Sequence, residues 1–370
     1  MAESINHGRV YPLPNKLTQP ISLFQHLSSS ATQSFNPHAW QRRILRGDIT
    51  VDGSVVLDLH HAVLPDSQVA YHRPPWNEPV APVLTLTPPL VPCRSSNFST
   101  LNVLYRDPHV LAIHKPPGLP TMPSQTYAEY TVLHTLRTAL KDQTLAPPQP
   151  VHRLGVGTSG VLLIATSLVG RQELSKAIRE RRVQKVYRAL VTGAHIPDTL
   201  RISCPIGPVP FPIGGGTLYA ACPETTPTAP AGKPSLSLVR VVRRNVATDQ
   251  AVVEVEIPTG RPHQIRIHMA YAGFPLVGDP LYLSGGLPDT SLKYYAQRNR
   301  EEEDNDTDEE GGVSRKEDQK DKEDKEGMVR RVTLPRDCGY SLHAHRITFE
   351  HPTMDGKWMT ITAPPPDHLM

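Results

Sequence analysis

Residues 151–166, VHRLGVGTSGVLLIAT, join a glycine-rich loop to an apolar run. The run VLLIAT consists of apolar and β-branched residues, a composition typical of a buried strand. The loop holds Gly155, Gly157 and Gly160, the G-x-G-x-x-G spacing of dinucleotide-binding loops. In those proteins a helix opens from the loop, whereas this sequence predicts a strand. The segment therefore predicts a loop and a central strand, and we expect no nucleotide cofactor.

The stretches around this segment show both helix and strand patterns. Helices are expected over 131–140, over the basic stretch 169–182 and over 263–273, where Gly273 should end the helix. Strands are expected on both sides of the Asp107-Pro108 turn, over 184–193, in a hairpin of 237–244 with 250–257, and at 342–349. Together these patterns indicate an α+β fold.

The chain divides into four predicted parts. Residues 1–20 should be an irregular N-terminus, and residues 21–75 a small unit with a hairpin turn at Asp52-Gly53. Residues 76–100 have the composition of a proline-rich linker. Residues 101–370 should form the large unit, interrupted by an acidic insertion at 298–327. That insertion has almost no apolar side chains, so we expect it to be disordered.

The net charge of +3 conceals an uneven distribution. Residues 298–326 contain 14 acidic and 7 basic residues, a net of −7, which leaves 32 basic and 22 acidic residues, a net of +10, in the remainder. A positive folded part favours a phosphate-rich partner. The four widely spaced cysteines indicate a reduced protein, and neither a signal peptide, a presequence nor an 18-residue apolar run is evident. We expect a monomer of the cytoplasm or nucleus with no membrane partner.

Five segments, taken in order, resemble the RluA-type RNA pseudouridine synthases, and most closely the plant-type RNA pseudouridine synthase 5 subgroup. They are VLYRDPHVLAIHKPPGLPTMPS at 103–124, the loop and strand at 151–166, KVYRALV at 185–191, GRPHQIRIHMAYAGFPLVGDPLY at 260–282 and LHAHRITFEHP at 342–352. The resemblance implies an α+β catalytic domain with a mixed, mainly antiparallel sheet. It implies isomerisation of uridine in tRNA or rRNA after the base is flipped out of its stack, with no cofactor or metal.

The small N-terminal unit resembles an S4-type α/β RNA-binding domain. Its basic helix and the turn GDITVDG at 47–53 carry this likeness. By the resemblance, Arg42, Arg43 and Arg46 would face RNA phosphates.

The resemblance also implies a set of site residues. Arg153 would fill the gap left by the flipped base, Tyr187 would stack on that base, and Arg266 would pair with the catalytic aspartate. Lys115 and Pro116 would shape the floor of the pocket. The remaining expected substrate-binding residues are His152, Leu154, Thr158, Ser159 and His263. For His263 and His268 a purely structural, hydrogen-bonded role is the preferred interpretation.

The position of the family's catalytic aspartate is occupied by Gly155, and no Asp or Glu occurs anywhere in 151–172. Glycine can neither attack nor accept a proton. The main hypothesis is still an RNA pseudouridine synthase, and the alternative is a non-catalytic RNA-binding protein on the same scaffold. Asp107 and Asp279 are the nearest replacement carboxylates, although each is next to a proline in a turn and a structural role is favoured.

Cys338, His343, His345 and His351 could be written as a metal-binding set. Their spacing fits no common zinc pattern, and the stretch LHAHRITF alternates like a strand. We therefore expect no metal site.

Overall fold

The computed structural model describes residues 3–5, 8–28, 37–85, 100–124, 127–210, 217–222, 232–283, 285–289 and 338–370. The acidic insertion predicted at 298–327 lies outside these residues. Within them, no helix combines the length and apolar character needed to cross a membrane.

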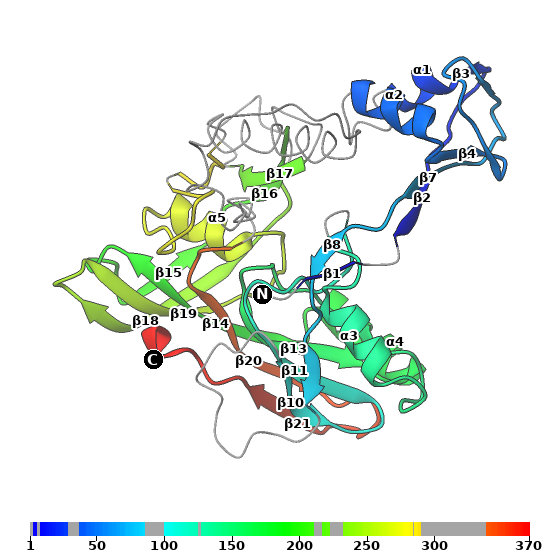
Figure 1. The fold of residues 1–370 in the computed structure, drawn as a ribbon. Coiled ribbons are helices and arrows are strands. Elements are labelled where there is room, and N and C mark those ends of the chain that lie inside the picture. The colour runs from blue at the N-terminus through cyan, green and yellow to red at the C-terminus, as the bar shows by residue number, and fades with distance from the viewer. Residues whose placement is uncertain are drawn as a thin grey trace, which may run out of the picture.

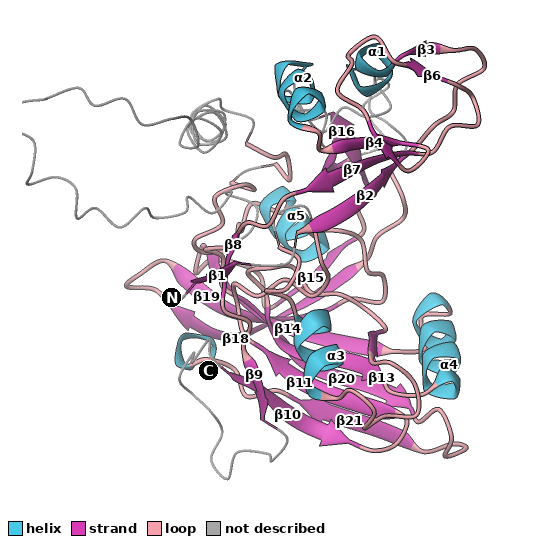
Figure 2. Ribbon diagram, turned by 45° about the vertical axis from the view of Figure 1, so that its right-hand side comes forward, coloured by secondary structure: helices cyan, strands magenta, loops and turns pink. Residues whose placement is uncertain are grey.

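One eleven-stranded sheet organises the larger part of the molecule (Figures 1 and 2). Its main path runs β15-β18-β19-β14-β20-β13-β11-β10-β9, with β12 beside β13 and β21 beside β20. The strands are β9 (Val83–Thr85), β10 (Thr100–Arg106), β11 (Val110–Lys115), β12 (Gln149–Pro150), β13 (Ser159–Ala165), β14 (Gln184–Thr192), β15 (Thr199–Ile202), β18 (Ser237–Asn245), β19 (Gln250–Glu256), β20 (Leu342–Glu350) and β21 (Trp358–Thr362). Neighbours are antiparallel except β13 with β20 and β9 with β10, which confirms the mixed, mainly antiparallel sheet.

The apolar run that opened the sequence analysis forms the middle of this sheet. Every residue of β13 is buried, because β11 and β20 flank it and helices cover it. Helices α3 (Val132–Ala139) and α4 (Leu168–Arg179) lie in this half of the molecule, and each begins at a side-chain cap, Thr131 and Ser167 respectively. Both helices and the strand match the predicted positions closely.

Helix α5 (Gln264–Tyr271) lies at the other end of the sheet, near β18 and a short ribbon of β16 (Ile206–Pro210) with β17 (Thr217–Ala221). Seven of its eight residues are buried. Its amphipathic pattern is therefore weak, and only its flanking Gly273 marked its end in the sequence.

The N-terminal lobe has its own sheet of order β2-β7-β4-β5 and two helices, and it stands apart from the large sheet in Figure 1. Its elements are β2 (Arg9–Leu13), β3 (Ile21–Ser22), α1 (Leu23–Ser28), α2 (Pro37–Arg46), β4 (Ile49–Val51), β5 (Ser54–Val55), β6 (Ala62–Val63) and β7 (Val69–Arg73). A separate apolar cluster, built around Trp40 and Ile44 of α2, fills it. The predicted turn at Asp52-Gly53 joins β4 to β5.

Part of the stretch predicted as a proline-rich linker is regular structure. Strand β8 (Asn77–Pro79) pairs with β1 (Glu3–Ile5), and β9 extends the large sheet. Glu78 is 1% exposed and accepts hydrogen bonds from the backbone N–H groups of residues 128–130. These bonds explain why a charged residue is buried here, and they tie the stretch to the large unit.

Candidate active site

The motif loop 151–158 is held against the end of β11 by a buried lysine. Lys115 is 0% exposed, and its Nζ donates to the carbonyl oxygens of Pro116 (2.8 Å), Leu119 (2.8 Å) and Val156 (3.1 Å). Burial lowers the pKa of Lys115 to about 7. The Lys115 side chain therefore links the backbone at Pro116 to the motif loop at Val156.

Two further contacts fix the loop. The Thr121 hydroxyl donates to the Leu154 carbonyl at 3.1 Å, and the Leu154 N–H lies 3.3 Å from the same oxygen. The His152 Nε2 accepts the Leu163 N–H at 3.1 Å, and burial lowers the pKa of His152 to about 3, which keeps the ring neutral. Thr121 was not among the predicted residues, since a lone threonine in a proline-rich turn gives no sequence signal.

Four of the five motif segments meet at one point of the sheet. Gly160 of β13 lies opposite Lys115 of β11 on one side and Ala344 of β20 on the other, and Tyr187 of β14 is opposite Ala344. Gly160 has a φ of +111°, and a Cβ there would overlap the Ala344 carbonyl. Only glycine fits this crossing of β13 and β20. Tyr187 is 8% exposed, and burial raises the pKa of its hydroxyl.

Arg266 has a buried carboxylate partner. Its Nε donates to Asp279 Oδ2 at 2.6 Å and its Nη2 to Oδ1 at 2.7 Å, and the two side chains are 2% and 0% exposed. Burial opposes the charge of Arg266, but the hydrogen bonds and charge of Asp279 raise its pKa above the ordinary value. Asp279 Oδ1 also accepts the N–H groups of Leu281 and Tyr282. Asp279 is thus a positioning carboxylate inside the protein, as its place beside a proline suggested.

Asp107 lies at the opposite end of β11 from the motif loop. It accepts the Tyr105 hydroxyl at 2.6 Å and the backbone N–H groups of His109 and Val110, and it pairs with His351 at 2.7 Å. Six residues of extended strand, roughly 20 Å, separate this turn from Lys115. Asp107 holds the β10–β11 turn and cannot reach the loop.

Tyr340 connects the motif loop to Arg266. Its ring lies under the Arg266 guanidinium, 4.1 Å from Cζ to the ring centroid, and its hydroxyl is 3.2 Å from Thr158 Oγ1. The loop turns back at this place, with the Thr158 N–H donating to the Gly155 carbonyl. Tyr340 was missed in the sequence because it precedes β20 and follows the acidic insertion, where no periodic pattern marks it.

The histidines serve as hydrogen-bonded supports. His263 Nδ1 is 3.0 Å from the Tyr282 hydroxyl, and His268 lies between Ser237 Oγ and the Cys204 carbonyl, both at 2.9 Å. His343 contacts Ser159 Oγ at 2.8 Å. His343, His345 and His351 point to different partners, and no cluster of metal-binding side chains occurs in the described part of the chain.

The predicted arginines divide into two groups. Arg266 is central, whereas Arg153 is exposed on the motif loop and no contact joins it to Arg266 or Tyr187. Arg42, Arg43 and Arg46 all lie on α2 of the N-terminal lobe. Arg42 is exposed, Arg43 packs over the rings of Trp40 and Tyr71, and Arg46 pairs with Asp48 at 2.6 Å.

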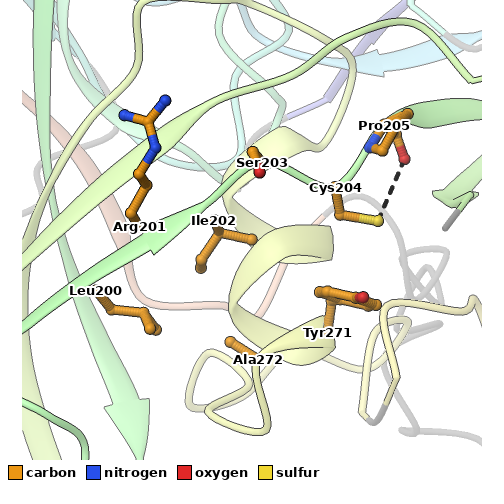
Figure 3. A pocket seen from close by; sticks show the side chains of 8 residues that line it. All are labelled: Leu200, Arg201, Ile202, Ser203, Cys204, Pro205, Tyr271 and Ala272. Atoms are coloured by element: carbon orange, nitrogen blue, oxygen red, sulfur yellow. Dashed lines mark hydrogen bonds between the residues drawn. The ribbon is translucent and has the colours of Figure 1, made fainter. Parts of the chain in front are cut away.

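A separate cavity lies at the C-terminal end of α5 (Figure 3). Its lining residues are Leu200, Arg201, Ile202, Ser203, Cys204, Pro205, Tyr271 and Ala272. In Figure 3 the Cys204 thiol donates to the Pro205 carbonyl at 3.6 Å. None of the predicted site residues lines this cavity, so it does not coincide with the Arg266–Tyr340 cluster.

The sequence is also similar to those of known proteins. The family model described as RNA pseudouridylate synthase matches residues 109–271. The chain is 36% identical to RNA pseudouridine synthase 5 of Oryza sativa subsp. japonica over 94% of this chain and 84% of that protein. The chain belongs to the RNA pseudouridine synthase family. RNA pseudouridine synthase 5 of Arabidopsis thaliana is 36% identical over 89% and 85% of the two chains.

A more distant pseudouridine synthase extends the comparison to bacteria. Ribosomal large subunit pseudouridine synthase D of Pseudomonas aeruginosa is 31% identical over 70% of this chain and 73% of that protein. The matched family segment contains the motif loop, Tyr187 and Arg266, but ends before Asp279 and Tyr340. Membership of the pseudouridine synthases confirms the family resemblance and the fold class.

Proposed function

We propose that this protein isomerises uridine to pseudouridine in RNA. The observation that carries the proposal is a chain of contacts: Thr158 and Tyr340 lie beside the exposed Gly155 of the motif loop, and Tyr340 packs against the buried Arg266–Asp279 pair. A buried arginine with a bidentate carboxylate is rigid, so it presents its remaining surface in a fixed orientation. A family scaffold that retains this cluster around residue 155 supports catalysis more than RNA binding alone.

The same proposal assigns roles to the remaining residues. Tyr187 stacks on the flipped base, Arg153 enters the gap that the base leaves, and the floor formed by Lys115 and Pro116 keeps the loop in place. Arg42, Arg43 and Arg46 contact phosphates. The protein works as a monomer in the cytoplasm or nucleus, on a structured RNA of the tRNA or rRNA type. The name of the Pseudomonas relative, a ribosomal large subunit enzyme, supports including rRNA.

In vitro transcripts of tRNA and rRNA test the activity, because they contain no pseudouridine at the start. After incubation with the protein, pseudouridine is mapped by chemical labelling and reverse transcription. We expect one or a few modified positions, and loss of the signal with Arg266→Leu. If tight RNA binding persists but no position is modified on any cellular RNA class, the protein is instead a non-catalytic binder.

A further inference from the structure

Gly155 and Tyr340 are spatially complementary. The φ of Gly155 lies outside the left-handed region, so its backbone would accept any residue. A Cβ at 155 would nevertheless lie 2.7 Å from the Tyr340 hydroxyl and 3.3 Å from Thr158 Oγ1. Gly160 differs, because there the backbone itself demands glycine. At 155 the side-chain space is instead filled by the phenol of another residue.

The phenol oxygen lies at the place where a carboxylate from residue 155 would begin. Tyr340 is 5% exposed, and its hydroxyl lies next to the exposed Gly155, which has no side chain. Gly155 therefore places no side chain between this oxygen and a base bound over the motif loop. Asp279 and Asp107 are excluded from this role, because the first is saturated by hydrogen bonds and the second lies at the far end of β11.

We propose that the Tyr340 phenol oxygen is the catalytic nucleophile of this protein, supplied from the segment before β20 in place of a carboxylate from residue 155. This inference rests on the proposed pseudouridine synthase activity. A tyrosine serves as the nucleophile at the anomeric carbon in the sialidases, in place of the usual carboxylate of glycosidases.

The chemistry balances without a co-reactant. Tyr340 first loses its proton to solvent, and its oxygen bonds to C1′ as the N1–C1′ bond breaks and the electron pair passes to N1. The freed uracil turns, C5 attacks C1′, and the O–C1′ bond breaks with its pair returning to the phenolate. The proton on C5 is then released and one is taken up at N1. Substrate and product have the same composition.

The charged and titratable groups that face the phenol come from three elements. They are Arg266 of α5, Asp279 of the loop after α5, and Cys338, two residues before Tyr340; Thr158 Oγ1 adds a hydrogen bond. Burial raises the pKa of Tyr340, while Arg266 and Thr158 act in the opposite direction. The reactive phenolate is thus a minor form at neutral pH, and activity should rise with pH by up to about tenfold per unit. A carboxylate nucleophile would give no such rise above pH 6.

The first test removes one oxygen atom. Tyr340→Phe keeps the ring under Arg266, so RNA affinity should stay within about threefold while the rate of pseudouridine formation falls by about a hundredfold or more. Tyr130→Phe is the matched control, since Tyr130 is a 3% exposed tyrosine of the same unit outside the cluster. A Tyr340→Phe variant that keeps more than a third of the wild-type rate overturns the inference.

The second test restores the carboxylate. In Gly155→Asp the new side chain meets the phenol oxygen, but in Gly155→Asp/Tyr340→Phe the nearest remaining atom of residue 340 is Cζ, 4.0 Å from the Cβ. We expect the double variant to regain activity over Tyr340→Phe, with a rate that no longer rises between pH 6 and 9. A wild-type rate that is flat over this range would contradict a phenol nucleophile. If the wild-type protein binds RNA but forms no pseudouridine, the proposed function itself is wrong, whatever the role of Tyr340.

Discussion

Arg266 and Asp279, thirteen residues apart in the chain, form a bidentate ion pair in which neither side chain is more than 2% exposed. The arginine that the resemblance assigns as the partner of a catalytic aspartate therefore has a carboxylate partner, although the motif loop supplies none. The pair also joins α5 to the turn at residues 279–282, because Asp279 accepts the backbone N–H groups of Leu281 and Tyr282.

Breaking this pair should strongly destabilise the protein. Asp279→Asn leaves the buried Arg266 without a counter-charge, and we expect a loss of about 3–5 kcal/mol in the free energy of unfolding. The exposed pair Arg244–Asp198 is the control, since the Asp198 side chain is 87% exposed and Asp198→Asn should cost less than about 1 kcal/mol. Urea denaturation measures both. Equal costs would show that the buried pair adds nothing specific.

The fit between Gly155 and Tyr340 can be tested without any assay of activity. Gly155→Ala places a methyl group against the Tyr340 hydroxyl and should cost about 1–2 kcal/mol of unfolding free energy. In a Tyr340→Phe background the same change should cost close to nothing, because the hydroxyl is gone. The double-mutant cycle would then give a coupling of about 1 kcal/mol or more. Additive effects would mean that Tyr340 moves aside freely.

His343 should make the protein sensitive to acid. Burial lowers the pKa of His343 to about 3, against 6.5 for the free side chain. The unfolded chain therefore binds this proton first, and stability present above pH 6.5 is lost as the pH falls toward 3. Between pH 3 and 6.5 the wild-type protein should take up about one more proton on unfolding than the His343→Gln variant. The slope of unfolding free energy against pH should therefore be smaller in the variant by about 1.4 kcal/mol per pH unit. The exposed His368→Gln is the control, and an unchanged slope in His343→Gln would count against a neutral buried ring.

The basic helix α2 should contribute to RNA affinity without affecting catalysis. Arg42→Ala and Arg46→Ala should each weaken RNA binding several-fold and reduce the slope of log affinity against log salt by about one. Lys357→Ala is the comparison, because Lys357 is exposed in the turn between β20 and β21, and strand β21 lies far from α2 in Figure 1. Filter binding at several salt concentrations gives both quantities. Identical salt slopes in all three variants would remove α2 from the RNA-binding surface.

The sequence alone determined the elements whose signal is local. The apolar run after Gly160, the capped helices α3 and α4, and the turn at Asp52-Gly53 follow from side-chain type and spacing, which depend on the backbone of a few neighbouring residues. The motif loop and Arg266 could likewise be found as short patterns. The loss of a carboxylate at 155 was also plain from the sequence.

Only the tertiary structure decided which side chain lies beside Gly155 and which one pairs with Arg266. Asp107 and Asp279 looked equivalent in the sequence, but the fold buries Asp279 beside Arg266 and places Asp107 at the other end of β11. Tyr340 is 185 residues from Gly155, and it reaches Gly155 because β20 pairs in parallel with β13. Contacts of this kind depend on the order of strands in the sheet and on the space beside a residue without a side chain. Neither can be predicted from the types and spacing of neighbouring residues in the sequence.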